Sequence, residues 1–118
     1  MVVSDFELEE VGKVVVATPC GAELSGTTMQ ELVDQLTERM RFNGSVLFVL
    51  DLKNVQYVAS ACLGPLVMFL QDLEHVHGRV VLAHCTQNVQ FLFTVTKLDS
   101  VFAMFDDLDD ACQELTGA

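Results

Sequence analysis

The side chains of this sequence that could take part in chemistry are concentrated between Asp51 and Cys85. Ser60 and Cys62 fall between an apolar segment that ends in Asp51 and an apolar helical pattern that begins just after them. A thiol at the N-terminus of a helix can have a lowered pKa and act as a nucleophile. Nucleophilic catalysis also requires a base, and the sequence alone does not bring His84 within reach of Cys62. Because cysteine is also often buried as a small apolar side chain, we expect that the chain is not an enzyme.

A metal site is the second kind of chemistry to consider. His75, His77, His84 and Cys85 lie close together in the sequence. An HxH motif followed at a distance by a His-Cys pair matches no closed tetrahedral pattern, so we expect neither a metal nor another cofactor. His75 and His77 are better explained as the polar end of a helix, where imidazolium interacts favourably with the helix dipole. The cysteines occur singly, which predicts free thiols at Cys20, Cys62, Cys85 and Cys112.

The elements around Ser60 decide where it lies. The run Val46 to Leu50 has no polar alternation, which is typical of a central strand covered on both faces. A helix should follow Ser60 and end at Gly78, because apolar residues recur at helical spacing: Leu66, Val67, Phe69, Leu70 and Leu73. Since α/β folds place ligands and partners at the carboxyl edge of the sheet, the segment between Asp51 and Ser60 is the predicted location of the site.

The segments before this strand predict a hairpin and a helix. Phe6, Leu8 and the run Val14 to Ala17 flank Gly12-Lys13, as in a two-stranded hairpin at the edge of a sheet. The helix should be capped by Ser25, Thr27 or Thr28 and end at Asn43-Gly44, with Met29, Leu32, Val33, Leu36 and Met40 on its apolar face.

The segments after Gly78 continue the alternation of strand and helix. Arg79 to Ala83 predicts a strand, and a helix over Asn88 to Thr96 should be capped by Thr86 or Asn88 and broken at Leu98-Asp99. Val101 to Phe105 predicts a last short strand. A final helix towards Leu115 should begin at an acidic run, where carboxylates interact favourably with the helix dipole: Asp106, Asp107, Asp109 and Asp110.

Composition and charge limit the function. With 118 residues, of which 51% are hydrophobic, we interpret residues 1–118 as a single domain. The net charge of −11 opposes binding to nucleic acids and to anionic lipid surfaces, and it favours a protein partner with a basic surface. No apolar run is long enough to span a bilayer, and the acidic start MVVSDFELEE is unlike a secretory signal, so we expect a cytoplasmic protein.

The order of elements resembles the STAS domain of bacterial anti-sigma factor antagonists and of the cytoplasmic tails of sulfate transporters. Residues 51–64, DLKNVQYVASACLG, are similar to the family pattern DLSxVxFIDSSGLG. Gly21 to Leu24 and Val89 to Asp99 are similar to the family patterns GELD and VxxLFxxTGLD. The resemblance covers nearly the whole chain. It implies an α/β fold with a mixed, mostly parallel central sheet of about five strands, an N-terminal hairpin at its edge and about four helices.

The chain departs from the family at the phosphorylation motif. In the family, the second serine of DSSG is phosphorylated by a partner that is both kinase and anti-sigma factor, and phosphorylation breaks the complex. This chain has Ala61 at that position, with Ala59 in place of the family aspartate and Cys62 in place of the glycine. Alanine has no oxygen to accept a phosphoryl group, so the usual switch is missing.

Ser60 is the one polar residue of the motif that remains. It is either a relocated phosphorylation site or an N-cap that accepts a hydrogen bond from a free helix N–H, and we favour the cap. Pro65 is tolerated only in the first turn of a helix, so the regular helix should begin near Leu63 or Gly64. Residues 59–62 should then form an exposed, partly irregular loop.

The resemblance implies a non-enzymatic protein-interaction module of the anti-sigma factor antagonist type, which acts in bacterial signal transduction and transcription regulation. We expect a kinase-like or anti-sigma-like regulatory protein to bind the loop and helix start through Tyr57, Ala59, Ser60, Ala61, Cys62 and Gly64. Without the acceptor hydroxyl, binding is expected to be constitutive or controlled elsewhere. Three alternatives stay open: a scaffold role in a larger complex, binding of a nucleotide or lipid between the first helix and this loop, and a homodimer formed through the edge of the first strand.

Overall fold

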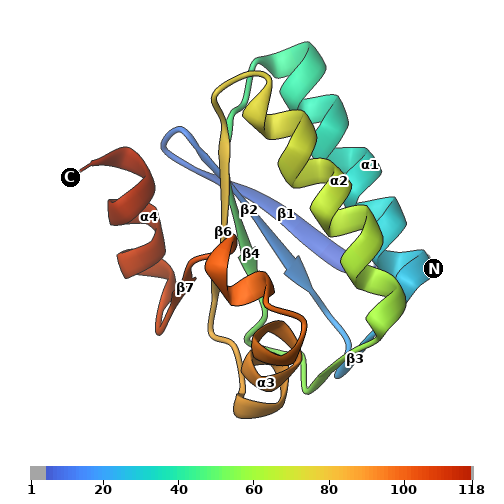
Figure 1. Ribbon diagram of the computed structural model, residues 1–118. Helices are drawn as coiled ribbons and strands as arrows, with labels where there is room; N and C mark the ends of the chain where they lie inside the picture. The colour runs from blue at the N-terminus through green and yellow to red at the C-terminus, as the bar shows by residue number, and fades with distance from the viewer. Residues whose placement is uncertain (1–4, 118) are drawn as a thin grey trace.

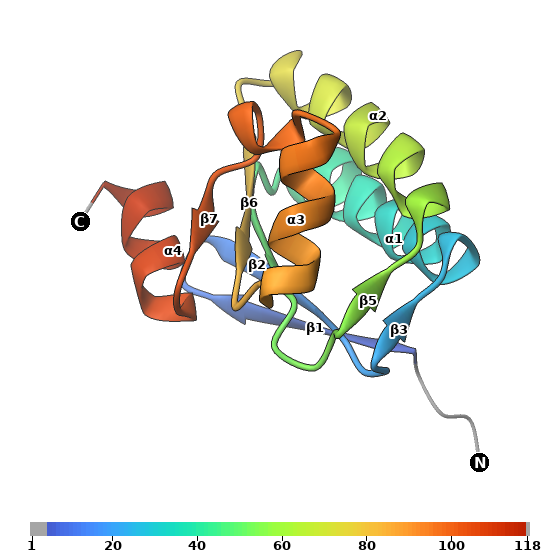
Figure 2. The ribbon, with the colours of Figure 1, turned by 60° about the horizontal axis from the view of Figure 1, so that its bottom comes forward.

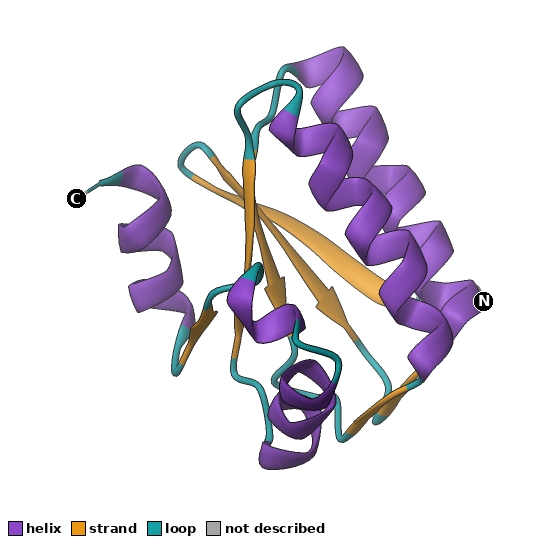
Figure 3. Cartoon of the chain, in the orientation of Figure 1, coloured by secondary structure: helices purple, strands orange, loops and turns teal. Residues whose placement is uncertain are grey.

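The computed structural model describes residues 5–117 and shows a twisted sheet with helices on both faces (Figures 1 and 3). The helices of this part of the chain are α1 (Gly26–Asn43), α2 (Leu63–Glu74), α3 (Gln87–Val95) and α4 (Leu108–Thr116). The main sheet contains β1 (Phe6–Val11), β2 (Val14–Pro19), β4 (Leu47–Asp51), β6 (Arg79–Ala83) and β7 (Met104–Phe105). A separate pair is formed by β3 (Glu23–Leu24) and β5 (Tyr57–Val58).

The main sheet has the strand order β1-β2-β4-β6-β7. The hairpin partners β1 and β2 are antiparallel, and β2, β4, β6 and β7 are parallel to one another. The carboxyl ends of four parallel strands therefore lie along one edge, which includes the ends of β4 and β6 at Asp51 and Ala83. Within residues 5–117 the predicted α/β architecture is confirmed: a mixed, mostly parallel five-stranded sheet with an N-terminal hairpin at its edge and four α-helices.

The central strand β4 is covered on both faces, as its unbroken apolar sequence predicts. Phe48 and Leu50 belong to the larger apolar cluster, which includes residues of α1, α2 and α3, while Val49 belongs to a smaller cluster with Ala111 of α4. The Phe48 ring packs edge-on against Phe69 of α2, with ring centroids 5.2 Å apart. Burial on both faces fixes the register of β4 and hence the position of the segment that follows it.

The helix caps agree with the sequence pattern and decide between the alternatives that it left open. The Ser25 side chain caps α1 by accepting a hydrogen bond from Thr28 N, and Gly44 ends α1 with a φ of 70°. Thr86 caps α3, and the Asp107 side chain caps α4 by accepting a bond from Asp110 N at 2.8 Å. These caps fix the ends of the helices relative to the sheet.

The chain reversal after α2 differs from the prediction. The helix ends at Glu74, and the left-handed residue of the reversal is His77, with a φ of 57°, rather than Gly78. Gly78 is required for close packing instead, because a Cβ there would lie 2.7 Å from both the Leu73 side chain and the Val46 carbonyl oxygen. Gly78 therefore lies at the predicted turn, but the prediction that it ends the helix was wrong.

The last strand is shorter than the sequence pattern predicted. The segment Leu98–Ser100 forms a 3₁₀ turn, and only Met104 and Phe105 pair with β6. Val101 is exposed, so its apolar side chain adds nothing to the sheet. The prediction of a strand from Val101 to Phe105 was wrong in its first three residues: Val101 lies at the surface, and Phe102 packs into the apolar core without strand geometry.

Candidate functional site

The candidate site is the tip, defined here as residues 57–64, which lies beyond the carboxyl edge of the main sheet (Figure 2). It contains β5, the 3₁₀ turn Ser60–Cys62 and the start of α2. The backbone of Tyr57 donates a hydrogen bond to the Ala22 carbonyl at 3.0 Å, and that of Ala59 donates to the Leu24 carbonyl at 3.0 Å. Pairing with β3, which the sequence analysis did not predict, thus holds the tip in a defined conformation.

Cys62 holds the tip against the apolar core. Its side chain is 0% exposed, and its thiol donates a hydrogen bond to the Leu24 carbonyl at 3.1 Å. Burial raises the pKa of Cys62, the opposite of the change that an activated nucleophile requires. The prediction that Cys62 contacts a partner directly was wrong, because the residue packs into the core in place of the glycine that the family pattern has there.

Ser60 is not a helix cap. The residue before the 3₁₀ turn is Ala59 and the residue before α2 is Cys62, and neither helix start receives a side-chain hydrogen bond. Within residues 5–117, the Ser60 hydroxyl makes no hydrogen bond to protein. The favoured explanation for Ser60 was therefore wrong, because the 3₁₀ turn separates it from the regular helix, which begins at Leu63 as the position of Pro65 predicted.

The remaining predicted residues lie together at the surface. Tyr57 is 60% exposed, and Ala59, Ser60, Ala61 and Gly64 are exposed as well. None of them carries a charge, although the chain as a whole is strongly acidic. The tip thus presents a small, mostly apolar surface on a backbone that is fixed by strand pairing and by Cys62.

Two concave surfaces flank the tip. One has a volume of about 210 Å³ and is lined by Glu23, Leu24 and Ser25 on one side and by Tyr57, Val58 and Ala59 on the other. The second is an open groove of about 540 Å³, lined by Gly26, Thr27, Gln30, Glu31 and Ala61. The predicted groove between the first helix and the loop therefore exists. The α1 residues that line it were missed, because nothing in the periodic pattern distinguishes them from an ordinary solvated helix face.

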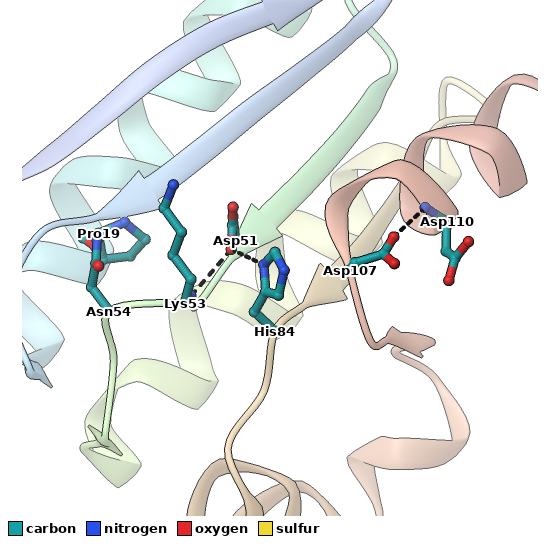
Figure 4. Close-up of polar contacts among 7 residues, drawn as sticks. All are labelled: Pro19, Asp51, Lys53, Asn54, His84, Asp107 and Asp110. Atoms are coloured by element: carbon teal, nitrogen blue, oxygen red, sulfur yellow. Dashed lines mark hydrogen bonds and ion pairs between the residues drawn. The ribbon is translucent and has the colours of Figure 1, made fainter.

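A hydrogen-bonded pair of Asp51 and His84 lies at the carboxyl edge of the sheet (Figure 4). Asp51, which is 1% exposed, accepts a hydrogen bond from Lys53 N at 3.1 Å, and its Oδ1 lies 2.8 Å from Nδ1 of His84. His84 has a φ of 57°, in the left-handed region that non-glycine residues rarely adopt. Asp51 thus contacts both the loop after β4 and the loop after β6.

The neighbouring thiol of Cys85 also has a raised pKa. Burial and the nearby Asp51 carboxylate raise the pKa of Cys85 to about 11. His84, which is the base considered for Cys62, is hydrogen-bonded to Asp51 instead. Neither cysteine therefore combines a lowered pKa with a hydrogen-bonded base.

A metal site was the second kind of chemistry considered from the sequence. Between residues 5 and 117, no group of three or more His, Cys, Asp or Glu side chains is arranged to hold a metal ion. His75 ends α2 and His77 forms the left-handed reversal that follows it. These histidines belong to the end of a helix, as predicted.

The exposed edge of β1 is where the alternative of a homodimer would form. Its residues Glu7, Glu9 and Glu10 are exposed, and Glu10 forms an ion pair with Arg39 at 3.3 Å. Charged side chains on an edge strand oppose pairing with a second copy, because they bring like charges together. Dimerisation through this edge stays a prediction, and its charge disfavours it.

The fold and the tip define a protein of the STAS class, and comparison with known families agrees. The STAS domain model matches residues 5–111, so the chain belongs to the STAS domain family. Several of the similar solved structures are described as anti-sigma factor antagonists.

Three solved structures illustrate the similarity. A Thermotoga maritima protein described as an anti-sigma factor antagonist has a TM-score of 0.85 and 22% identity, with 94% of each chain covered. The phosphorylated form of the Bacillus cell-fate determinant SpoIIAA has a TM-score of 0.72 and 20% identity, with 92% of this chain and 97% of that chain covered. The murine anion transporter solute carrier 26 family member A9 has a TM-score of 0.73 and 15% identity, and the match covers 93% of this chain but 19% of the transporter. At these identities the similarity establishes the fold.

The transporter match raises the question of a membrane segment. Among residues 5–117, no helix has both the length and the apolar character that crossing a membrane requires.

Proposed function

We propose that this chain is a non-enzymatic interaction module that binds a regulatory protein of the kinase or anti-sigma factor class in the bacterial cytoplasm. The partner binds at the tip, through Tyr57, Ala59, Ser60, Ala61 and Gly64. The observation that carries the proposal is the exposure of these uncharged side chains on a backbone held in place by β3 and Cys62. A rigid, partly apolar surface loses little conformational entropy on binding, which favours recognition of a protein.

The absence of a hydroxyl at Ala61 determines how this binding is regulated. Phosphorylation adds roughly −1.5 to −2 charges, which is sufficient to disrupt an uncharged interface. Ala61 cannot be phosphorylated, so the complex is not switched at that position. Ser60, whose hydroxyl is exposed and makes no hydrogen bond to the described protein, is the residue at which a relocated switch would act.

A catalytic role is less consistent with the structure. Cys62 and Cys85, which follow β5 and β6, both have raised pKa values, and neither thiol is hydrogen-bonded to a base. The Asp51–His84 pair is used to hold two loops together. These observations support an interaction module rather than an enzyme.

Site-specific photo-crosslinking tests the proposal. A photo-reactive amino acid is placed at Ser60 in the chain expressed in its native host, and crosslinked proteins are identified by mass spectrometry. The matched control carries the same amino acid at Gln113, an exposed residue of α4 on the opposite side of the sheet from α1 and α2 (Figure 1). We expect a specific regulatory protein to be captured from Ser60 and not from Gln113. Equal capture from both positions, or none from either, would contradict the proposal.

A further inference from the structure

We propose that the groove beside the tip receives an arginine side chain of the protein partner. This inference rests on the proposed function and specifies the chemistry of the partner at one point. The groove is formed by the first turns of α1 and by Ala61, so it is continuous with the tip. A partner that covers the tip therefore also covers the groove.

The lining of the groove suits a long side chain with a cationic head. Gly26 and the Ala61 methyl group provide a small, mostly apolar floor, along which the aliphatic part of an arginine can lie. Thr27, Gln30 and Glu31 provide oxygen atoms around it. The Gln30 side chain donates its amide hydrogen to Asp34 Oδ1 at 3.0 Å, which leaves the Gln30 carbonyl oxygen free to accept.

The charged side chains along α1 beside the groove are acidic. Glu31, Asp34 and Glu38 follow one another along the exposed side of α1, leading away from the tip. Within residues 5–117, the ion pairs join Arg39 to Glu10, Arg79 to Glu114 and His84 to Asp51, so none neutralises this row. A cationic group is attracted to the groove, whereas a phosphate or a fatty acid carboxylate is repelled by it.

Arginine fits this arrangement better than lysine. A guanidinium group presents several donors in one plane and can bind a carboxylate through two parallel hydrogen bonds while it also reaches a neighbouring carbonyl oxygen. Glu31 and Gln30, both of which line the groove, provide that combination of acceptors. The partner is therefore expected to place an arginine next to the surface that contacts Ala61.

The experiment uses a minimal probe in place of the unidentified partner. The ¹⁵N-labelled protein is titrated with the blocked peptide Ac-Ala-Arg-Ala-NH₂ and, separately, with Ac-Ala-Gln-Ala-NH₂, and the amide shifts are followed by NMR. We expect the arginine peptide to shift the amides of Gly26, Thr27, Glu31 and Ala61, and the glutamine peptide to leave them unchanged. The variant Glu31→Gln should weaken binding of the arginine peptide by roughly threefold or more, as expected for loss of a partly exposed ion pair.

The matched control is Glu38→Gln, which removes the same charge from the same helix two turns away. It should retain binding, because Glu38 does not line the groove. The inference is overturned if the two variants lose affinity equally, or if the shifts are spread over the whole acidic surface. It is also overturned if the same amides shift with protein concentration alone, since a second copy of this chain would then be the occupant.

This test is independent of the crosslinking experiment. The peptide titration needs no natural partner, and crosslinking from Ser60 does not depend on Glu31. A captured partner together with a silent titration would leave the proposed function intact and remove only the arginine subsite, whereas the reverse result would remove the proposed function.

Discussion

Gly26 and Ala61 lie in direct contact, the first at the start of α1 and the second at the centre of the tip. A Cβ atom added to Gly26 would lie 2.8 Å from the Cβ of Ala61 and 3.4 Å from its carbonyl oxygen. Such a distance is shorter than real Cβ contacts, so no larger residue fits unless the tip moves. Glycine at position 26 therefore sets the position of the tip against α1.

The variant Gly26→Ala is expected to displace the tip. In an unobstructed helix this change would be stabilising, but here overpacking against Ala61 should reduce the free energy of unfolding by about 1–2 kcal/mol. Urea unfolding gives the change in stability, and ¹⁵N NMR reports whether the amides of residues 59–62 shift. The control is Gly64→Ala, where an added Cβ meets nothing within 4 Å and stability should be unchanged or slightly higher. Equal effects of the two substitutions would show that the Gly26–Ala61 contact does not constrain the tip.

A negative charge at the centre of the tip is expected to weaken partner binding. The variant Ala61→Glu places a carboxylate in the uncharged tip, beside Glu31 of the groove. Like charges and desolvation at an interface should lower affinity for the crosslinked partner by about tenfold or more, measured by calorimetry. Ala61→Gln has nearly the same size without the charge and should lose much less. If glutamine weakens binding as much as glutamate, size rather than charge is what the interface excludes at this position.

The sequence was sufficient for the sheet and helices but not for the contacts between loops. The unbroken apolar run before Asp51 predicts a strand that is buried on both faces. The helical spacing of apolar residues after Ser60 predicts a helix with one buried face. The pairing of β3 with β5 leaves no such pattern in the sequence. Each of these strands has only two residues, and Leu24 is the one buried residue of the pair.

The two wrong predictions at the tip have a common physical origin. The lack of a capping hydrogen bond from Ser60 and the burial of Cys62 both depend on a 3₁₀ turn, which rotates successive side chains by a different angle from an α-helix. Pro65 correctly predicted where the regular helix begins. The sequence did not predict the direction in which each side chain before the helix points.

The buried Asp51 is expected to contribute measurably to stability. Asp51→Ala removes the acceptor for Lys53 N and the partner of His84, and leaving these donors without a partner should cost about 1–3 kcal/mol. Asp51→Asn keeps one oxygen acceptor and should lose less. Urea unfolding measures both, with Asp106→Ala as an exposed control that should change little. If alanine at position 51 were as stable as the wild type, the pair would not be holding the two loops.

Lys97 marks a position where the chain can be stabilised. It has a φ of 63° after the end of α3, at the position where the family pattern has glycine. Lys97→Gly removes the strain of a left-handed non-glycine residue and should raise the free energy of unfolding by about 0.5–1 kcal/mol. Lys97→Ala removes the same side-chain charge but keeps the strain, so it should give no gain. A gain of equal size in both variants would assign the effect to the charge of Lys97 rather than to its backbone conformation.

The cysteines are expected to react with iodoacetamide in an order set by burial. Cys20 is exposed and should be labelled first, whereas Cys62 and Cys85 should be protected in the folded protein. Because the pKa of Cys85 is raised to about 11, only about one thiol in a thousand is ionised near pH 8, and its labelling rate should rise about tenfold per pH unit until the pH approaches that pKa. Mass spectrometry of labelled peptides measures each site, and a urea-unfolded sample, in which all four cysteines should react at similar rates, is the control. Rapid labelling of Cys62 in the folded protein would contradict its place beneath the tip and reopen the case for a reactive thiol at the start of α2.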